Sequence, residues 1–315
     1  MPGHEDVAAV VLSYQPDAGA LEALLERIAP QVGRIILIDN GSAPPARHSL
    51  GVVLQRFPAV RALLLHENVG VAGGHNRGIS LAADQGCKFV LLLDQDSLPA
   101  PDMVVQLLRG YEVAARQTTA VAAVGPCFVQ NLSRTETSFV QLGWLHFKKR
   151  WCGAEPEELV PVDLLISSGA LIAKKALDSV GLMREELFVD QVDTDWFLRA
   201  RSRGWSIFGV CAAKMEHSLG DRTLRIWIGR WRDIPVHSPL RHYYAFRNGV
   251  FLSLRSGHPW RWKLATAQRL VGLLVVFTLL LPERSAHLKM MLAGACDGAR
   301  GRLGAYGVTH NEAVG

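Results

Sequence analysis

The sequence predicts an α/β fold whose mainly parallel, Rossmann-like sheet is flanked by helices. Two observations support this prediction. Short apolar runs alternate with helical stretches through the first third of the chain, which is typical of a parallel sheet covered by helices. Each run also ends in polar residues, namely Ser13, Asp39, Asn68 and Asp94. Parallel strands end at one edge of a sheet, where open α/β folds bind ligands, so we expect these side chains to converge.

The individual elements follow from hydrophobic periodicity. Apolar residues at helical spacing predict a helix over 17–29. Four apolar runs predict strands, at 8–13, 34–38, 60–65 and 88–93.

Two carboxylates follow the fourth strand, in Asp94-Gln95-Asp96. Side chains of a strand alternate, which would place Asp94 and Asp96 on one side. Two neighbouring anions repel unless a cation lies between them, and hard oxygen ligands suit a divalent metal that also takes phosphate oxygens. By itself, the motif is equally consistent with a solvated turn.

A glycine-rich segment spans 68–78 and precedes a helical pattern at 79–83. Glycines allow a backbone to approach a ligand closely, and a helix N-terminus favours anions. Arg77 adds a cation that could reach a diphosphate. No Gly-Lys-Ser/Thr follows, which excludes a nucleotide P-loop. A plain turn is the alternative here, as it is for Asp39-Asn40-Gly41.

A second acidic cluster contains Asp190, Asp193 and Asp195. It predicts the start of a helix that runs to Arg203 and is stopped by Gly204, because acidic residues in a first turn complement the helix dipole.

These motifs, in this order, resemble family 2 glycosyltransferases of the GT-A fold, and most closely the rhamnosyltransferase subgroup that uses dTDP-L-rhamnose. The segments that carry the resemblance are 11–14, 38–42, 68–78, 94–96, 168–170, 190–199 and 217–220. The resemblance covers roughly residues 7 to 255. It implies a GT-A domain over 1–256, with a nucleotide-sugar half at about 7–125 and an acceptor and catalytic half at about 126–256.

The resemblance also implies roles for individual residues. Asp193 would be the general base, with Asp190 as the alternative, because Val192 stands where many members carry Glu. Asp39 would accept a hydrogen bond from the pyrimidine N3–H. The residues implied to bind the nucleotide sugar are Ser13, Asp39, Asn40, Asn68, Gly70, Asn76, Arg77, Asp94, Gln95 and Asp96. A divalent metal, Mg²⁺ or Mn²⁺, would lie on Asp94, Asp96 and His217. Further contacts with diphosphate or acceptor are expected from Ser168, Gly169, Asp195, Trp196, Arg241 and Arg247.

Composition limits the partners. The net charge of +5 and the pI of about 9.1 suit a diphosphate ligand or an anionic membrane surface. No basic run is interleaved with aromatic residues, so we expect no nucleic-acid partner. The five cysteines are scattered, which predicts reduced thiols in a cytoplasmic protein. The polar, acidic N-terminus lacks the pattern of a secretory signal.

The C-terminal part, 257–315, is predicted to be a helical appendage. Residues 270–281 are almost wholly apolar, but the run is shorter than the ~20 residues that a transmembrane helix needs. Aromatic and basic residues precede it, at 260–263, which is typical of a membrane interface. We expect a helical hairpin lying on, or dipping into, the inner leaflet of the plasma membrane. A buried packing helix or a homodimer helix is the alternative, and the tail from Gly294 is expected to fray.

Together these features predict an inverting, metal-dependent glycosyltransferase at the cytoplasmic membrane face. It would extend a lipid-linked or oligosaccharide acceptor in cell-surface polysaccharide synthesis. Two rivals are a nucleotidyltransferase and a non-catalytic protein that binds sugar nucleotides. The first would place a basic, glycine-rich loop after the first strand, where Ser13-Tyr14-Gln15-Pro16 stands.

Overall fold

The computed structural model describes residues 3–129, 138–153, 159–216, 222–227, 231–279 and 284–307. The chain forms two compact units. Unit 1 contains Met1–Leu142, Lys148–Glu185 and Val192–His217. Unit 2 contains Gly143–Phe147, Glu186–Gln191 and Ser218–Gly315.

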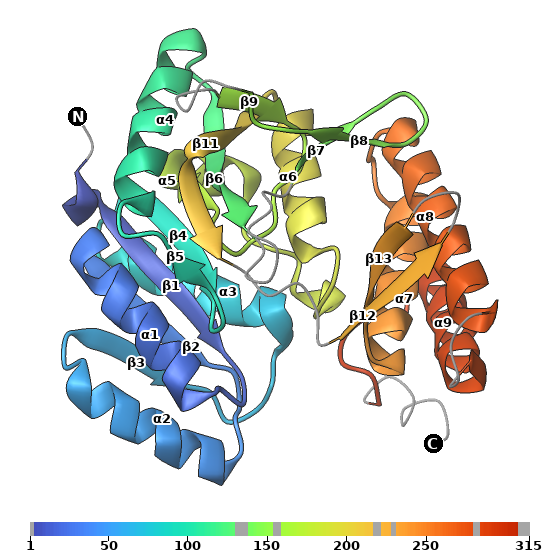
Figure 1. The fold of residues 1–315 in the computed structure, drawn as a ribbon, viewed down its shortest axis with the longest axis horizontal. Coiled ribbons are helices and arrows are strands. Elements are labelled where there is room, and N and C mark those ends of the chain that lie inside the picture. The colour runs from blue at the N-terminus through green and yellow to red at the C-terminus, as the bar shows by residue number, and fades with distance from the viewer. Residues whose placement is uncertain are drawn as a thin grey trace. The chain divides into compact units, whose positions relative to one another are not determined.

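Unit 1 is built on a mixed sheet with strand order β3-β2-β1-β4-β10-β6-β11-β5, and β9 pairs with β11 (Figure 1). Within it β3, β2, β1 and β4 are parallel, and β6 is parallel to β11, whereas the short β10 runs antiparallel between β4 and β6. The strands are β1 Val7–Ser13, β2 Arg34–Asp39, β3 Val60–Leu64, β4 Phe89–Asp94, β5 Leu98–Pro99, β6 Val121–Val129, β9 Leu159–Val162, β10 Leu171–Ala173 and β11 Ser206–Glu216. A separate two-stranded sheet pairs β7 Phe139–Leu142 with β8 Phe147–Arg150.

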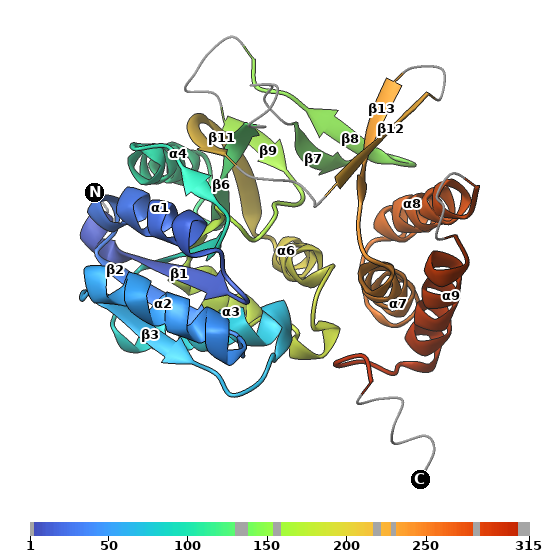
Figure 2. The same ribbon diagram turned by 60° about the horizontal axis from the view of Figure 1, so that its bottom comes forward.

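Helices cover this sheet (Figure 2). They are α1 Ala18–Ile28, α2 Pro44–Arg56, α3 Gly70–Asp84, α4 Met103–Gln117, α5 Lys174–Val180 and α6 Val192–Ser202, with short 3-10 turns at His4–Asp6, Ala29–Gln31 and Glu185–Leu187. Helix α1 is capped by Asp17, whose carboxylate accepts from the Ala20 amide at 2.8 Å. The four strands and the helix expected in the first part of the chain are therefore confirmed to within a residue or two.

The glycine-rich segment differs from the prediction. Helix α3 begins at Gly70, so residues 70–78 are helical and do not form a loop. A Cβ at Gly74 would meet Leu12 Cδ1 at 2.3 Å, and one at Gly78 would meet Val10 Cγ1 at 2.2 Å. These two glycines therefore allow α3 to lie unusually close to β1, and their spacing of four places both on one face of the helix.

Unit 2 contains the helices α7 Pro239–Arg255, α8 Trp260–Leu279 and α9 Arg284–Arg300, and the hairpin of β12 Arg222–Trp227 with β13 Trp231–Val236. The predicted fraying from Gly294 is wrong as far as Arg300. A Cβ at Gly294 would meet the Tyr243 carbonyl oxygen at 2.3 Å, and one at Gly298 would meet the Arg247 carbonyl oxygen at 2.3 Å. The tail glycines thus let α9 pack against the backbone of α7.

The prediction for the cysteines is also wrong in part. Cys152 and Cys211 form a disulfide within unit 1, although the two residues are 59 positions apart in sequence. Cys87, Cys127 and Cys296 are not joined in a disulfide. Scattered spacing could not reveal this pair, because the fold of residues 138–216 brings the two residues together.

Candidate functional site

Strand register brings the predicted polar residues of unit 1 to one edge of the sheet. Ser13 is paired with Asp39 across β1 and β2, and Leu12 is paired with Asp94 across β1 and β4. Ser13 is fully buried, and its hydroxyl has no hydrogen-bond partner among the described residues. A buried hydroxyl without a partner at a strand end is a feature that a ligand could satisfy.

Asp39 is fully buried and carries three hydrogen bonds. The Ser42 hydroxyl and amide donate to its two oxygens, and Arg47 Nε donates to Oδ2 at 3.1 Å. The Arg47 guanidinium also donates to the Leu65 carbonyl. The ion pair offsets the cost of burying the carboxylate and fixes its orientation at the end of β2.

An amide network joins the loops that follow β2 and β3. Asn40 Nδ2 donates to Asn68 Oδ1 at 3.1 Å and to the Gly70 carbonyl at 3.0 Å, and Asn40 Oδ1 accepts from the Val69 amide at 3.0 Å. Asn68 Oδ1 also accepts from the Gly70 amide at 2.9 Å. These contacts hold the two loops together at the start of α3.

The segment Asp94–Ser97 is a tight turn, in which the Ser97 amide donates to the Asp94 carbonyl at 3.1 Å. Asp94 is the last residue of β4, and Asp96 lies in the turn, so strand alternation does not set their relative direction as expected. Asp94 is half-buried and Asp96 is exposed. Gln95 ties the turn to the loop after β1, because its side-chain amide accepts from Tyr14 N at 2.7 Å and donates to Tyr14 O at 3.1 Å.

Ser168 holds the same turn from the opposite side. Its hydroxyl accepts from the Asp94 amide at 3.1 Å and lies 2.6 Å from the Ser97 hydroxyl, and both serines are buried. Gly169 follows with φ +83, a left-handed conformation that favours glycine. A Cβ there would meet Pro126 Cγ at 2.6 Å. Pro126 and Met215 therefore leave no room for a side chain at this position.

Two predicted residues of α3 are engaged within the protein. The Asn76 side-chain amide donates to the Met183 carbonyl and to Glu185 Oε1, both at 2.9 Å, and accepts from the Met183 amide at 2.9 Å. Arg77 Nη1 donates to the Gly73 carbonyl at 2.8 Å and lies 3.6 Å from Glu185 Oε2. Asn76 is buried, so its contacts secure α3 to residues 183–185, whereas Arg77 is partly exposed.

His75 is a buried residue that the sequence interpretation did not single out. It is fully buried in α3, and neither ring nitrogen has a partner among the described residues. Burial lowers the pKa of His75 to about 4, so its imidazole is neutral at pH 7.

The acidic residues of α6 occupy different environments. Asp195 is fully buried, with Arg199 Nε at 2.8 Å and Arg184 Nε at 3.6 Å from its Oδ2. Asp193 is half-buried, its Oδ1 accepts from the Thr194 amide at 2.7 Å, and its Oδ2 accepts from the Ser167 amide at 3.3 Å. Trp196 is buried and donates from Nε1 to the Gly181 carbonyl at 2.8 Å. Asp195 and Trp196 therefore stabilise the protein interior, and Asp193 is the acid of this helix that remains accessible.

Asp190 lies in unit 2, outside the helix. Its backbone is left-handed, with φ 61, as are those of Phe188 and Gln191, each with φ 63. Arg241 Nε donates to Asp190 Oδ2 at 2.9 Å. The segment 188–191 thus contains three residues that are left-handed without being glycine, which makes its backbone locally strained. Strained backbone of this kind clusters at functional sites.

Arg247 and Asn248 brace this segment. The fully buried Arg247 guanidinium donates to carbonyls of Glu186, Leu187 and Gly304, and it lies 4.8 Å from the Tyr244 ring centroid. Burial lowers the pKa of Arg247 from its usual value. The predicted diphosphate or acceptor contact for Arg247 does not fit this position, because its guanidinium is committed to backbone carbonyls.

Of the three predicted metal ligands, the structure describes Asp94 and Asp96. His217 lies outside the described residues. Among the residues that the structure describes, no group of three His, Cys, Asp or Glu side chains could hold a metal ion. Asp94 and Asp96 remain at the edge of the sheet as two carboxylates on one turn.

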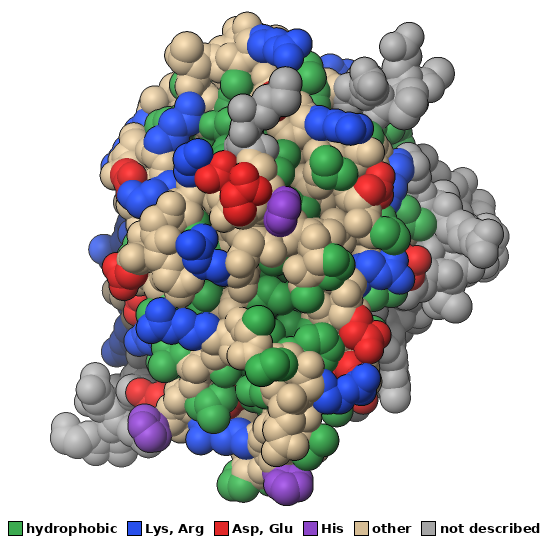
Figure 3. All heavy atoms as spheres, turned by 90° about the vertical axis from the view of Figure 1, so that its left-hand side faces the viewer, with side chains coloured by type: hydrophobic (Ala, Val, Ile, Leu, Met, Phe, Trp, Pro, Cys, Tyr) green, Lys and Arg blue, Asp and Glu red, His purple; other side chains and the backbone are tan. Residues whose placement is uncertain are grey.

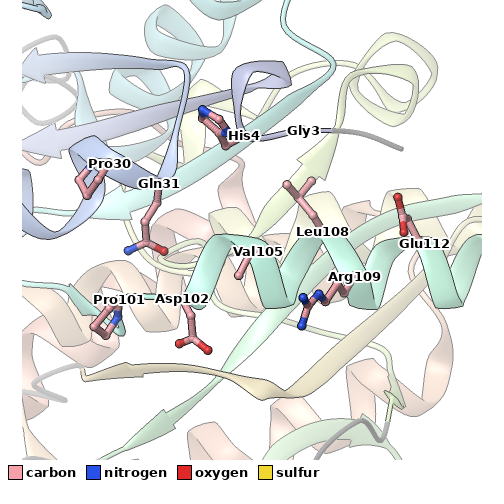
Figure 4. A pocket seen from close by; sticks show the side chains of 10 residues that line it. All are labelled: Gly3, His4, Pro30, Gln31, Pro101, Asp102, Val105, Leu108, Arg109 and Glu112. Carbon is pink, nitrogen blue, oxygen red and sulfur yellow. The ribbon is translucent and has the colours of Figure 1, made fainter.

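A cavity of about 410 Å³ lies elsewhere in unit 1, between the first 3-10 turns and α4 (Figure 4). The residues that line it are Gly3, His4, Pro30, Gln31, Pro101, Asp102, Val105, Leu108, Arg109 and Glu112. None of the predicted site residues belongs to this set, so we do not place the site there. On the face that Figure 3 shows, basic and acidic side chains are interspersed with hydrophobic ones.

Sequence reasoning missed the residues that support the site from within. Arg47 and Ser42 fix Asp39, Ser97 contacts Ser168, and Glu185 contacts Asn76. Each of these supporting residues lies between 3 and 109 positions in sequence from the residue that it contacts, and only the fold brings the distant pairs together. One of these contacts had a local signal in the sequence: Ser42 follows Asp39 by three positions, which is typical of a turn closed by a serine hydroxyl.

Comparison with known proteins identifies the domain. Residues 10–159 match the family model described as Glycosyl transferase family 2. These residues are a family 2 glycosyltransferase domain. The protein is accordingly a glycosyltransferase. It is also similar to the dTDP-rhamnosyl transferase RfbF of Shigella flexneri, with 28% identity over 305 residues, or 96% of this chain and 98% of that protein.

Two solved structures share the fold. The crystal structure of GalNAc-T7 with UDP, GalNAc and Mn²⁺ has a TM-score of 0.59 and 11% identity, over 93% of this chain and 56% of that chain, so this chain spans little more than half of GalNAc-T7. The mannosyltransferase PcManGT from Pyrobaculum calidifontis, in complex with GDP-Man and Mn²⁺, has a TM-score of 0.53 and 14% identity, over 95% of this chain and 89% of that chain. The predicted GT-A fold is confirmed, with C-terminal helices present.

Proposed function

We propose that this glycosyltransferase moves L-rhamnose from dTDP-L-rhamnose to a glycan acceptor with inversion at the anomeric carbon. The observation that carries the proposal is the similarity to the rhamnosyl transferase RfbF, which extends over nearly the whole of both chains. Ser13 and Asp39, which lie buried at the end of the sheet, are the residues proposed to contact the nucleotide. Arg47 orients the Asp39 carboxylate. Acceptance of a hydrogen bond from the pyrimidine N3–H stays a prediction for this residue.

We propose a divalent metal, Mg²⁺ or Mn²⁺, on Asp94 and Asp96. Their oxygen donors fit a hard cation, because such ions commonly use one or two protein carboxylates and take the remaining ligands from phosphate and water. When bound, the ion would stabilise the charge of the departing diphosphate. Gln95, Ser97 and Ser168 fix the turn that carries both carboxylates. His217 stays a predicted third ligand.

We propose Asp193 as the general base. During transfer, the acceptor hydroxyl attacks the anomeric carbon, its proton passes to the Asp193 carboxylate, and the bond from the anomeric carbon to the diphosphate breaks. Asp195 is unsuited to this role because it is buried between Arg184 and Arg199. Asp190 stays the alternative base, with Arg241 at its carboxylate.

The acceptor is proposed to be lipid-linked or an oligosaccharide, and the reaction to take place in cell-surface polysaccharide synthesis at the cytoplasmic face of the inner membrane. This part of the proposal derives from the sequence of the C-terminal helices and from the family resemblance.

A donor screen with the purified full chain tests the proposal. Nucleotide release is measured from dTDP-L-rhamnose, UDP-sugars and GDP-mannose, each with Mg²⁺, with Mn²⁺ and with a chelator. We expect release from the dTDP sugar alone, dependent on metal. A preference for a GDP sugar would remove the rhamnose assignment, and full activity in chelator would remove the metal.

Three variants, at Asp96, Asp193 and Asp190, assign the roles, and a fourth is their control. Asp96→Ala should abolish the metal-dependent rate, and Asp193→Asn should lower turnover about 10²–10⁴-fold while dTDP binding is retained. Asp102→Ala is the matched control, because Asp102 is an exposed acid that lines the cavity of Figure 4. If Asp190→Asn, and not Asp193→Asn, is the inactive variant, the base assignment moves to Asp190.

A further inference from the structure

Helix α8 exposes an apolar face. Val271, Val275 and Leu279 recur at every fourth position and are all exposed, with Val271 at 60% and Leu279 at 69%. Among the described helices, α8 is the one that is long and apolar enough to cross a membrane by length and composition, although only 22% of its apolar stretch is buried. A helix that hides one apolar face in a protein normally turns a polar face outward. Helix α8 does not follow this rule.

Helix α9 shares the property. Its inner side contributes the fully buried Met291 to a cluster with Phe246, Leu270 and Phe277. Its outer side exposes Leu288 and Leu292, again four residues apart. The two helices lie side by side in unit 2 (Figure 2). Both therefore pack through one apolar face and leave a second apolar face uncovered.

Within the described residues of α8 and α9, the exposed charges have one sign. Within 260–279 and 284–300, every charged side chain that is exposed or partly exposed is basic; these are Arg261, Lys263, Arg269, Arg284, Lys289 and Arg300. The single acid of these ranges, Asp297, is buried and accepts a hydrogen bond from the Tyr243 hydroxyl at 2.8 Å. An uncovered apolar surface with basic residues is complementary to an anionic surface.

Two exposed tryptophans meet at the start of α8. Trp144 is 66% exposed and Trp260 is 55% exposed, although they are far apart in sequence. Their ring centroids lie 6.0 Å apart, and the Arg261 guanidinium lies 4.6 Å from the Trp144 ring centroid and 5.7 Å from that of Trp260. Tryptophan and arginine side chains that combine an apolar body with a polar end are enriched at the boundary between lipid and water.

We propose that the exposed faces of α8 and α9 dock on an anionic lipid bilayer, with Trp144, Trp260 and Arg261 as the anchor at the headgroup level. The helices lie in the interface and do not cross the bilayer. Arg269 is exposed near the middle of α8, and a spanning helix would place this charge at the bilayer centre, where it is costly. A second copy of the chain is a poorer occupant of this surface, because two basic faces repel.

Vesicle binding of the full chain tests the proposal. Co-sedimentation is measured with vesicles of phosphatidylcholine alone and with vesicles that contain phosphatidylglycerol, at low and high salt. We expect binding to the anionic vesicles, partly lost in high salt because only the basic contribution is screened. Tryptophan emission should shift to shorter wavelength on binding and be quenched by lipids brominated near the headgroup.

Variants locate the surface. Val271→Glu combined with Val275→Glu should lower affinity for anionic vesicles at least about tenfold, because carboxylates replace apolar contacts and repel the anionic lipid. Trp144→Ala combined with Trp260→Ala should lower affinity and abolish most of the lipid quenching. Val52→Glu is the matched control, because Val52 is an exposed valine on α2 of unit 1. Its vesicle affinity should equal that of the unaltered protein.

Several outcomes overturn the proposal. One is a full chain that ignores anionic vesicles while light scattering shows a dimer that Val271→Glu with Val275→Glu dissociates, since the face would then bind a second copy. Another is equal loss of vesicle binding in Val52→Glu. A third is a tryptophan shift caused by soluble oligosaccharide and not by vesicles, which would make the tryptophan pair a glycan contact. Thermal melting of each variant distinguishes lost binding from lost folding, and the assay does not depend on the sugar donor.

Discussion

Replacing Asn248 by alanine should destabilise the strained segment before α6. The Asn248 side chain is fully buried, and its Nδ2 donates to the carbonyls of Leu187 at 2.9 Å, Val189 at 2.7 Å and Asp190 at 2.8 Å. Alanine leaves these three carbonyls without that donor. One net hydrogen bond contributes roughly 1 kcal/mol, and a buried carbonyl left without a donor costs about 1–3 kcal/mol, so the total loss is about 2–4 kcal/mol.

The backbone of this segment explains why the loss matters. Phe188, Asp190 and Gln191 have φ values of 63, 61 and 63, and each left-handed residue costs on the order of 1 kcal/mol relative to an ordinary conformation. The segment persists because Asn248 and Arg247 hold its carbonyls. Without Asn248, we expect the segment to relax and the carboxylate of Asp190 to lose its position beside Arg241.

Thermal melting and amide exchange of the full chain measure the effect. Asn248→Ala should lower Tm by at least about 5 °C and raise exchange at 187–191, whereas Gln268→Ala, an exposed amide on α8, should change neither. Adding Gln191→Gly to Asn248→Ala should recover about 1 kcal/mol, because glycine adopts this φ without strain. A Tm for Asn248→Ala within 1 °C of the unaltered protein, with unchanged exchange, would refute this account of the segment.

Three further outcomes are expected. Gly169→Ala should cost about 2–4 kcal/mol by urea unfolding, since φ +83 is unfavourable for alanine and its Cβ has no room. Gln95→Ala should change the free energy of unfolding in urea by less than about 1 kcal/mol, because the hydrogen bonds of Gln95 to Tyr14 are exposed. It should nevertheless lower metal-dependent turnover of the dTDP sugar, because the turn at 94–97 loosens. Unchanged kinetics would contradict this role. The protein should lose stability in mild acid, because the pKa values of His75 and His242 are each lowered to about 4 by burial. Histidine in the unfolded chain titrates near pH 6.5, so between pH 6.5 and 4 the unfolded chain binds more protons than the folded chain. The free energy of unfolding is therefore highest above pH 6.5 and falls toward pH 4, by up to about 3 kcal/mol for each histidine. A His75→Leu variant with the same pH dependence of urea unfolding would show that His75 does not contribute.

The parts of the fold that the sequence predicted correctly are those with strong local patterns. Helix α1 repeats apolar residues at helical spacing behind an Asp17 cap, and β1 and β2 are short apolar runs that end in Ser13 and Asp39. Parallel register then follows from topology, which is why the edge of the sheet and its polar residues could be anticipated.

The errors come from glycine and cysteine, whose roles depend on distant neighbours. The glycines of 70–78 indicate a ligand loop locally, yet Gly74 and Gly78 lie within α3, where their missing side chains allow the helix to approach β1. Gly294 and Gly298 suggest a frayed tail, yet they allow α9 to contact the α7 backbone. No local property of these residues distinguishes close packing from flexibility.

The acidic cluster 190–195 shows how environment divides one sequence motif into separate roles. The three carboxylates are chemically identical, and spacing alone suggested a helix start for all of them. The family resemblance suggested Asp193 as the general base, with Asp190 as the alternative. In the structure, Asp195 is buried with two arginines, Asp193 is half-buried and held by backbone amides, and Asp190 lies on a left-handed backbone beside Arg241. A buried carboxylate paired with two cations cannot readily take a proton from a substrate. Asp193 and Asp190 therefore stay the two candidates for the proposed general base. Exchanging each for asparagine distinguishes them, because the amide preserves the shape of the side chain and removes only the proton acceptor.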